Sequence, residues 1–148
     1  MKISGRSIVF AVASAALTVG TLAAPAAADG SVRSNVVVHT AGDGTQPPAE
    51  LGNPKEWGVV TLTLDDLAGS VTPKIIVEAG GGTWSYGWEA RNDRKYCYSN
   101  YYHRTVNHGS TVKIAGGSVK AVAFPGETSN ANRSAGFAYT CETYYAKY

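Results

Sequence analysis

The 148-residue sequence lacks the common short motifs of enzymes and metal sites. It contains no G-x-S-x-G nucleophile elbow, no H-E-x-x-H pair and no C-x-x-C pair. His103 and His108 are five residues apart with a predicted turn between them, so they need not share one face for a metal ion. Asp65 and Asp66 are adjacent and should point apart, unlike the paired carboxylates of a glycosidase. We therefore expect no enzyme activity, no cofactor and no metal site.

Long apolar runs are almost absent, and the one that exists is at the start. Two basic residues precede an uncharged run at 7–24, and Ala26 and Ala28 then supply small side chains. This order is typical of a secretory signal peptide, here residues 1–28, with cleavage between Ala28 and Asp29. The alternative, a membrane anchor, is disfavoured because the run is short and ends in a cleavage-type sequence. We expect a secreted, extracellular protein.

Cysteine is scarce as well, with Cys97 and Cys141 as the only two, and both lie in the exported part. An even count in an oxidising compartment predicts a disulfide between them. They are 44 positions apart, and the chain-entropy model gives such a cross-link at most roughly 4 kcal/mol of stabilisation. The alternative is a pair of free, buried thiols.

Charge is distributed unevenly along the exported chain. Residues 29–79 hold three basic and seven acidic side chains, a net charge of −4, whereas residues 80–148 hold eight and four, a net charge of +4. This asymmetry suggests an anionic partner for the basic part, or an acidic segment that covers it until processing. The alternative is a solvated surface with no role. Because the two parts sum to zero, nucleic acid is not an expected partner.

Helical periodicity is missing, and short strand-like runs replace it. The expected strands are 35–40, 57–64, 74–79, 82–88, 95–102, 110–114, 118–124 and 134–146. Expected turns contain RND, NHG, GG and PGETSNAN, with Asn107-His108-Gly109 as a hairpin turn. The fold class is therefore all-β, a small antiparallel β-sandwich of two sheets. We divide it into an acidic N-terminal segment, 29–79, with two or three strands, and a basic, aromatic-rich module, 80–148.

Aromatic and polar side chains are densest between Trp84 and Arg104. Such residues suit sugars, lipid head groups and proteins, and arginine suits pyrophosphate and carboxylate. The binding candidates are Trp88, Arg91, Arg94, Asn100, Tyr101, Tyr102, His103, Arg104 and His108. The alternative is that the rings form the core, which we favour for Trp84 and Tyr98. The sequence does not decide between core and binding surface for three residues near strand ends: Tyr101, Tyr102 and Trp88.

Two blocks and the C-terminus of this module resemble the lactococcin 972 family of secreted bacteriocins. The matching positions are Gly82, Thr83, Trp84, Gly87, Tyr98, Ser99, Asn100, Tyr101, His103, His108, Thr111, Val112, Tyr144 and Tyr145. The resemblance covers 80–148, less than half of the chain. The segment 29–79 and the cysteine pair depart from the family's founding pattern.

This resemblance implies two three-stranded antiparallel sheets and an antibacterial protein that stops septum formation in competing Gram-positive cells. It implies the cell-wall precursor lipid II, or another anionic envelope component, as the target, a homodimer as the active form, and membrane immunity and export proteins in the producer. The alternatives are a cell-wall or carbohydrate-binding β-sandwich module without killing activity, and an inhibitor of a foreign protease that uses residues 125–132.

Overall fold

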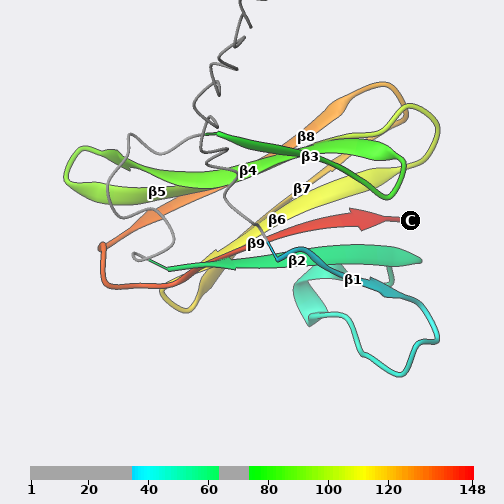
Figure 1. The fold of residues 1–148 in the computed structure, drawn as a ribbon, viewed down its shortest axis with the longest axis horizontal. Coiled ribbons are helices and arrows are strands. Elements are labelled where there is room, and N and C mark those ends of the chain that lie inside the picture. The colour runs from blue at the N-terminus through cyan, green and yellow to red at the C-terminus, as the bar shows by residue number, and fades with distance from the viewer. Residues whose placement is uncertain (1–34, 64–73) are drawn as a thin grey trace, which may run out of the picture. The chain divides into compact units, whose positions relative to one another are not determined.

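The computed structural model describes residues 35–63 and 74–148, which form two antiparallel β-sheets (Figure 1). The five-stranded sheet has the order β1-β2-β9-β6-β7, and the four-stranded sheet has the order β3-β4-β5-β8. The strands are β1 (Val37–Thr40), β2 (Glu56–Leu62), β3 (Ile75–Ala79), β4 (Gly82–Arg91), β5 (Arg94–Tyr102), β6 (His108–Ile114), β7 (Gly117–Ala123), β8 (Thr128–Ala135) and β9 (Cys141–Lys147), with one 3-10 turn, η1 (Ala49–Leu51). The predicted fold class is confirmed.

The signal peptide prediction lies outside the described residues. Residues 1–28 and the expected cleavage between Ala28 and Asp29 belong to a part of the chain on which the structure gives no information. In the two described ranges, no helix has the length and apolar character needed to cross a bilayer.

Residues 80–148 supply three strands to each sheet, as the family resemblance implies: β9, β6 and β7 to one, and β4, β5 and β8 to the other. The segment before residue 80 extends both sheets. β2 pairs with β9 from Glu56↔Lys147 to Leu62↔Cys141, and β3 pairs with β4. The described residues therefore form one compact unit in which both parts of the chain share the same sheets.

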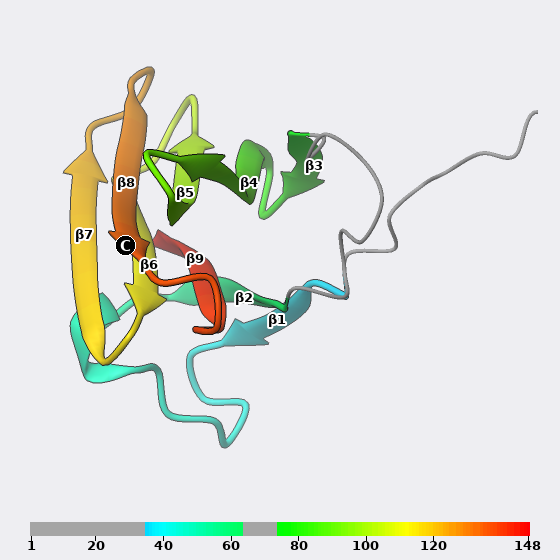
Figure 2. The same cartoon turned by 90° about the vertical axis from the view of Figure 1, so that its left-hand side faces the viewer.

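Two apolar clusters hold the sheets in place. The larger lies between the sheets and includes Val60, Trp84 and Tyr145. The smaller lies on the outer face of the five-stranded sheet, where Leu51 packs with Trp57. β7 is an edge strand of the five-stranded sheet, and β8 is an edge strand of the four-stranded sheet. These two strands pack beside each other, so the two sheets approach each other there (Figure 2).

Three hairpins have two-residue turns in which both residues have positive φ. The turn residues are Gly80 and Gly81, Asn92 and Asp93, and Ala115 and Gly116. This conformation matches the twist of the flanking strands, which is why Asn, Asp and Gly are common in it. The turns expected at RND and GG are confirmed.

One predicted strand, 134–146, is wrong. Two strands replace it: β8 (Thr128–Ala135), which begins inside the expected PGETSNAN turn, and β9 (Cys141–Lys147). The inward positions of β8 are Ser129, Ala131 and Ala135, all small and buried. Small buried residues alternate with exposed polar ones along β8, except at Arg133, which is exposed. The strand therefore lacks the large apolar residues that mark a strand in a sequence.

The expected hairpin at Asn107-His108-Gly109 is also wrong. β5 and β6 do not pair, because the chain crosses from the four-stranded to the five-stranded sheet between them. His108 is the first residue of β6. The Asn-x-Gly pattern therefore marks the approach to a strand and not a turn between paired strands.

Candidate functional site

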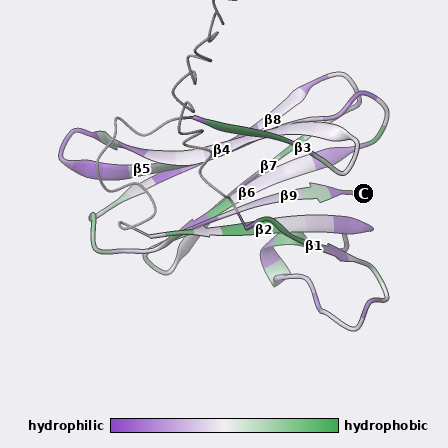
Figure 3. Cartoon of the chain, in the orientation of Figure 1, coloured by the Kyte–Doolittle hydropathy of each residue, from purple (hydrophilic) through white to green (hydrophobic). Residues whose placement is uncertain are grey.

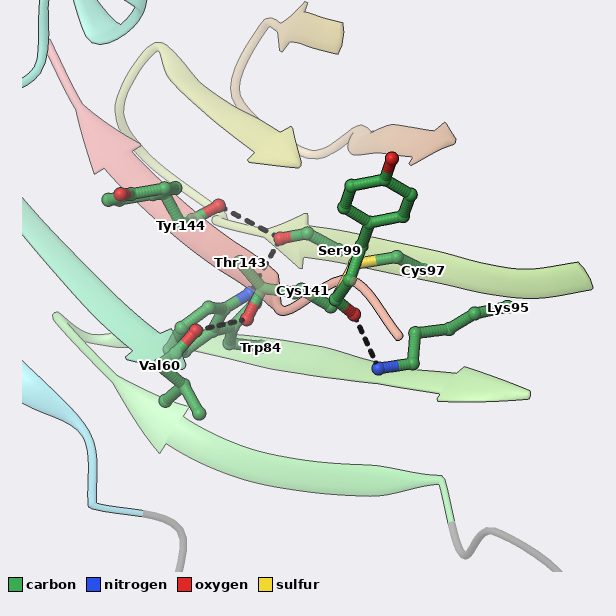
Figure 4. The surroundings of a disulfide bond; sticks show 9 residues. Val60, Trp84, Lys95, Cys97, Ser99, Cys141, Thr143 and Tyr144 are labelled. Carbon is green, nitrogen blue, oxygen red and sulfur yellow. Dashed lines mark hydrogen bonds between the residues drawn. A yellow bond between two sulfur atoms is a disulfide. The ribbon is translucent and has the colours of Figure 1, made fainter. Parts of the chain in front are cut away.

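The predicted disulfide between Cys97 and Cys141 is confirmed, and it joins the two sheets. Cys97 lies on β5 and Cys141 on β9, with their Cα atoms 6.1 Å apart, and both are fully buried (Figure 4). The link therefore fixes one central strand of each sheet against the other.

Beside the disulfide, three residues from the family motif form a hydrogen-bonded chain. The Trp84 indole N–H donates to Ser99 Oγ at 2.9 Å, and Ser99 Oγ donates to the Tyr144 carbonyl at 2.8 Å (Figure 4). All three are buried. The first bond joins β4 to β5, and the second joins β5 to β9. These motif residues therefore hold the three strands together and do not face solvent.

Four of the nine binding candidates are buried, and this corrects the sequence analysis. Trp88 is 9% exposed, His103 6%, and Tyr101 and His108 are both fully buried. The Tyr101 hydroxyl donates to the Ala79 carbonyl at 2.9 Å. Each side chain lies between the sheets or against loop backbone, so none of the four presents a surface for a partner.

His103 and His108 hold loops in place. His103 Nδ1 accepts from the backbone N–H groups of Thr105 and Val106, and its Nε2 faces the Gly80 carbonyl at 3.1 Å. His108 faces a carbonyl oxygen with each ring nitrogen, that of Val106 at 2.8 Å and that of Glu127 at 3.0 Å. Both contacts are satisfied together only when both His108 nitrogens carry a proton.

Trp88 packs in a cationic and aromatic environment below the surface. The Lys95 ammonium lies 5.0 Å from the Trp88 ring centroid and donates to the Tyr139 carbonyl at 2.7 Å. Phe137 meets Trp88 edge-on. Because Lys95 is only 1% exposed, this cation serves the packing of the interior.

The other five candidates have exposed or partly exposed side chains. Asn100 and Tyr102 are partly exposed on β5, and Arg91, Arg94 and Arg104 are exposed. Arg94 contacts the Ser134 carbonyl at 3.5 Å. Arg91 and Asn100 lie together around one cavity, whereas Tyr102 and the remaining arginines do not line it.

This cavity lies on the outer face of the four-stranded sheet and has a volume of about 230 Å³. Its lining residues, which we call the tyrosine face, are Lys74, Glu89, Arg91, Tyr96, Tyr98 and Asn100. Lys74 directly precedes β3, and the other five residues lie on β4 and β5. The β4–β5 hairpin is hydrophilic at its tip, whereas β3 beside it is hydrophobic (Figure 3).

Tyr98 is the centre of the tyrosine face, and the expectation that it belongs to the core is wrong. Its ring lies over Gly87, directly across on β4, where a Cβ atom would be 2.8 Å from the Tyr98 hydroxyl oxygen. Partial burial raises the pKa of this hydroxyl, with a further contribution from Glu89. Trp84, by contrast, is confirmed as a core residue.

Sequence reasoning found Arg91 and Asn100 but missed Lys74, Glu89 and Tyr96. A signal was present, because Tyr96, Tyr98 and Asn100 alternate along β5 with the buried Lys95, Cys97 and Ser99. A strict period of two places the first set on one face of the sheet. Lys74 carries no such signal, since it reaches the site only through the pairing of β3 with β4.

In the described part of the chain, no three His, Cys, Asp or Glu side chains gather to hold a metal ion. The rings of His103 and His108 are 6.2 Å apart, but their nitrogens are used by backbone groups. The arrangement can recognise a partner through rings, amides and charges on an open face.

Comparison with known proteins gives one match. No curated protein and no solved structure matches the chain. A family model described as bacteriocin (lactococcin 972) matches residues 80–145, which include the motif residues packed around the disulfide and Asn100 on the tyrosine face. Residues 80–145 of this chain are therefore similar to the bacteriocins of the lactococcin 972 family.

Proposed function

We propose that this protein is a secreted bacteriocin that blocks septum and cell-wall synthesis in competing Gram-positive bacteria by binding lipid II. The observation that carries the proposal is the family match over 80–145. The signal-like residues 1–28 support secretion. The family is not typically enzymatic, and we propose recognition without catalysis.

The chemistry of the tyrosine face supports a cell-wall target. Lipid II carries a pyrophosphate, a peptide and two sugars, and the sugars are the part that this face suits. The face combines two tyrosine rings, an amide and charged groups of both signs around one cavity. Aromatic rings with polar tips suit ligands that have both apolar and polar surfaces.

We further propose that the active form is a homodimer and that the producer encodes membrane immunity and export proteins. The described part of the acidic segment pairs with sheet edges and packs on the outer face of the five-stranded sheet. A role of this segment in covering the basic part of the chain remains a prediction, since residues 64–73 lie outside the described ranges.

The proposal is tested with purified protein on lawns of Gram-positive strains and on lipid vesicles. We expect zones of growth inhibition, cells that elongate without septa, and binding to vesicles that contain lipid II but not to the same vesicles without it. Absence of inhibition on every strain contradicts the proposal. Co-sedimentation with peptidoglycan without growth inhibition supports the alternative, a wall-binding module without killing activity.

A further inference from the structure

The polar groups of the tyrosine face are largely without partners inside the protein. Among the described residues, the Tyr98 hydroxyl and the Asn100 amide make no hydrogen bond. Ser85, directly across from Asn100 on β4, is 9% exposed, and its hydroxyl also has no partner. Tyr98 and Asn100 are partly exposed and line the cavity, so their hydroxyl and amide groups can donate to and accept from a ligand there.

The three groups lie on the same side of the sheet. Ser85 pairs with Asn100 and Gly87 pairs with Tyr98, and residues directly opposite in an antiparallel pair share one face. Because Gly87 has no side chain, the Tyr98 ring lies against the backbone of β4 and borders the cavity. A flat aromatic ring that carries a hydroxyl and has an amide beside it is a composition suited to a sugar ring.

The charges of the tyrosine face point to an uncharged occupant. Arg91 forms an ion pair with Glu89, and its guanidinium carbon lies 3.9 Å from the Tyr96 ring centroid. Its charge is therefore matched within the protein, and only Lys74 adds a further positive charge at the edge. A pyrophosphate needs several uncommitted cations or N–H groups at one place, and this cavity does not offer them.

We infer that the tyrosine face binds an uncharged N-acetylated amino sugar of a cell-wall glycan, stacked on Tyr98 and hydrogen-bonded by Asn100. The Asn100 amide both donates and accepts, which suits an acetamido group and neighbouring hydroxyls. The cavity of about 230 Å³ is below the roughly 300–1,000 Å³ of drug-sized pockets, so it fits one ring of a chain. The inference rests on the proposed function only for the source of the sugar.

The experiment titrates the purified, isotope-labelled protein with fully N-acetylated chitotetraose and follows backbone amide signals by NMR. We expect shifts at Ser85, Tyr98 and Asn100. The variant Tyr98→Ala should bind about tenfold more weakly, because it removes the ring on which the sugar stacks; this is a loss of about 1.4 kcal/mol. Tyr139→Ala is the matched control, since Tyr139 is 53% exposed and does not line the cavity.

Three outcomes overturn the inference. The first is no shift at any tetrasaccharide concentration, and the second is binding that Tyr98→Ala and Tyr139→Ala weaken equally. The third is a response to inorganic pyrophosphate but not to the sugar, which makes the cavity an anion site. Asn100→Ala provides a second test that leaves the ring in place and should also weaken binding. The assay contains no cells, so sugar binding and growth inhibition can fail independently.

Discussion

At Gly58 the absence of a side chain makes room for the ring of Tyr145. The two residues are directly paired between β2 and β9, and a Cβ atom at Gly58 would be 2.2 Å from a Tyr145 ring carbon. The Tyr145 hydroxyl donates to Glu56 Oε1 at 2.9 Å. The same pairing of glycine with tyrosine occurs at Gly87 and Tyr98 on the other sheet. At these two positions, glycine inside a strand leaves room for a tyrosine ring on the neighbouring strand.

The substitution Gly58→Ala should lower the free energy of unfolding by about 1–3 kcal/mol, the usual effect of overpacking a core. Urea unfolding followed by tryptophan fluorescence measures the change. Gly136→Ala is the control, because its nearest neighbours, Tyr139 ring atoms, lie 3.6 Å from the added carbon. Equal stability of the two variants would contradict the close approach of Tyr145 to Gly58.

Stability should fall at alkaline pH because of the buried tyrosines. Burial raises the pKa of Tyr101, Tyr144 and Tyr145, and the neighbouring carboxylates of Glu142 and Glu56 add to the shift for Tyr144 and Tyr145. In the unfolded chain these hydroxyls lose their protons near pH 10. Between that pH and the higher folded pKa the unfolded state binds fewer protons, so the free energy of unfolding decreases as pH rises.

A pH titration that records tyrosinate absorbance and circular dichroism on the same sample checks this expectation. The absorbance change of the three buried tyrosines should coincide with the loss of β structure. Full ionisation of every tyrosine in protein that retains its native spectrum would show that these hydroxyls are accessible in the folded state.

At the scale of elements, strands with large alternating side chains were predictable, and β8 was not. Leu62, Trp84 and Val112 stand in runs of β-branched or aromatic residues whose alternation identifies a strand without further information. β8 uses serine and alanine toward the core because β6 and β7 pack closely against it. That proximity is a property of how the sheets meet, which local sequence does not encode.

The candidate site was partly predictable for a related reason. Asn100 stood out through the family motif, and Arg91 through charge. The burial of Tyr101 and the exposure of Tyr98 follow from a register that places odd and even residues of β5 on opposite faces. Since a shift by one residue exchanges the two faces, residue types alone do not assign them.

Removal of the disulfide should loosen the contact between β5 and β9. The double variant Cys97→Ala, Cys141→Ala is expected to lose up to about 4 kcal/mol, the chain-entropy value for a loop of this length. Denaturant unfolding measures the loss, and far-ultraviolet circular dichroism reports whether the sheets persist. Wild-type protein under reducing conditions is the companion sample, and unchanged stability in both would show that the link contributes nothing to the fold.

At the scale of the whole molecule, the described residues before residue 80 share their sheets and core with the part that matches the family model. β2 covers one edge of β9, and β3 covers one edge of β4. Val60, Leu62 and Ile75 from these strands are part of the main core. Unpaired strand edges promote association between molecules, so these two strands also protect the three-stranded sheets.

A fragment of residues 80–148 should be less stable than residues 29–148. Each of the three lost core side chains contributes about 1.5–3 kcal/mol on burial, a large share of the roughly 5–15 kcal/mol total of a typical domain. Thermal unfolding measures stability, and sedimentation detects association through the uncovered edges. A monomeric fragment as stable as the longer chain would show that the segment is an accessory to a self-sufficient module.

The disulfide between Cys97 and Cys141 also means that the protein reaches its full stability only in an oxidising compartment. Cytosolic glutathione and thioredoxin keep thiols reduced. A chain still inside the cell would therefore lack the covalent bond between its two sheets. Material made for experiments therefore belongs in a periplasmic or extracellular expression route, where oxidation completes the molecule.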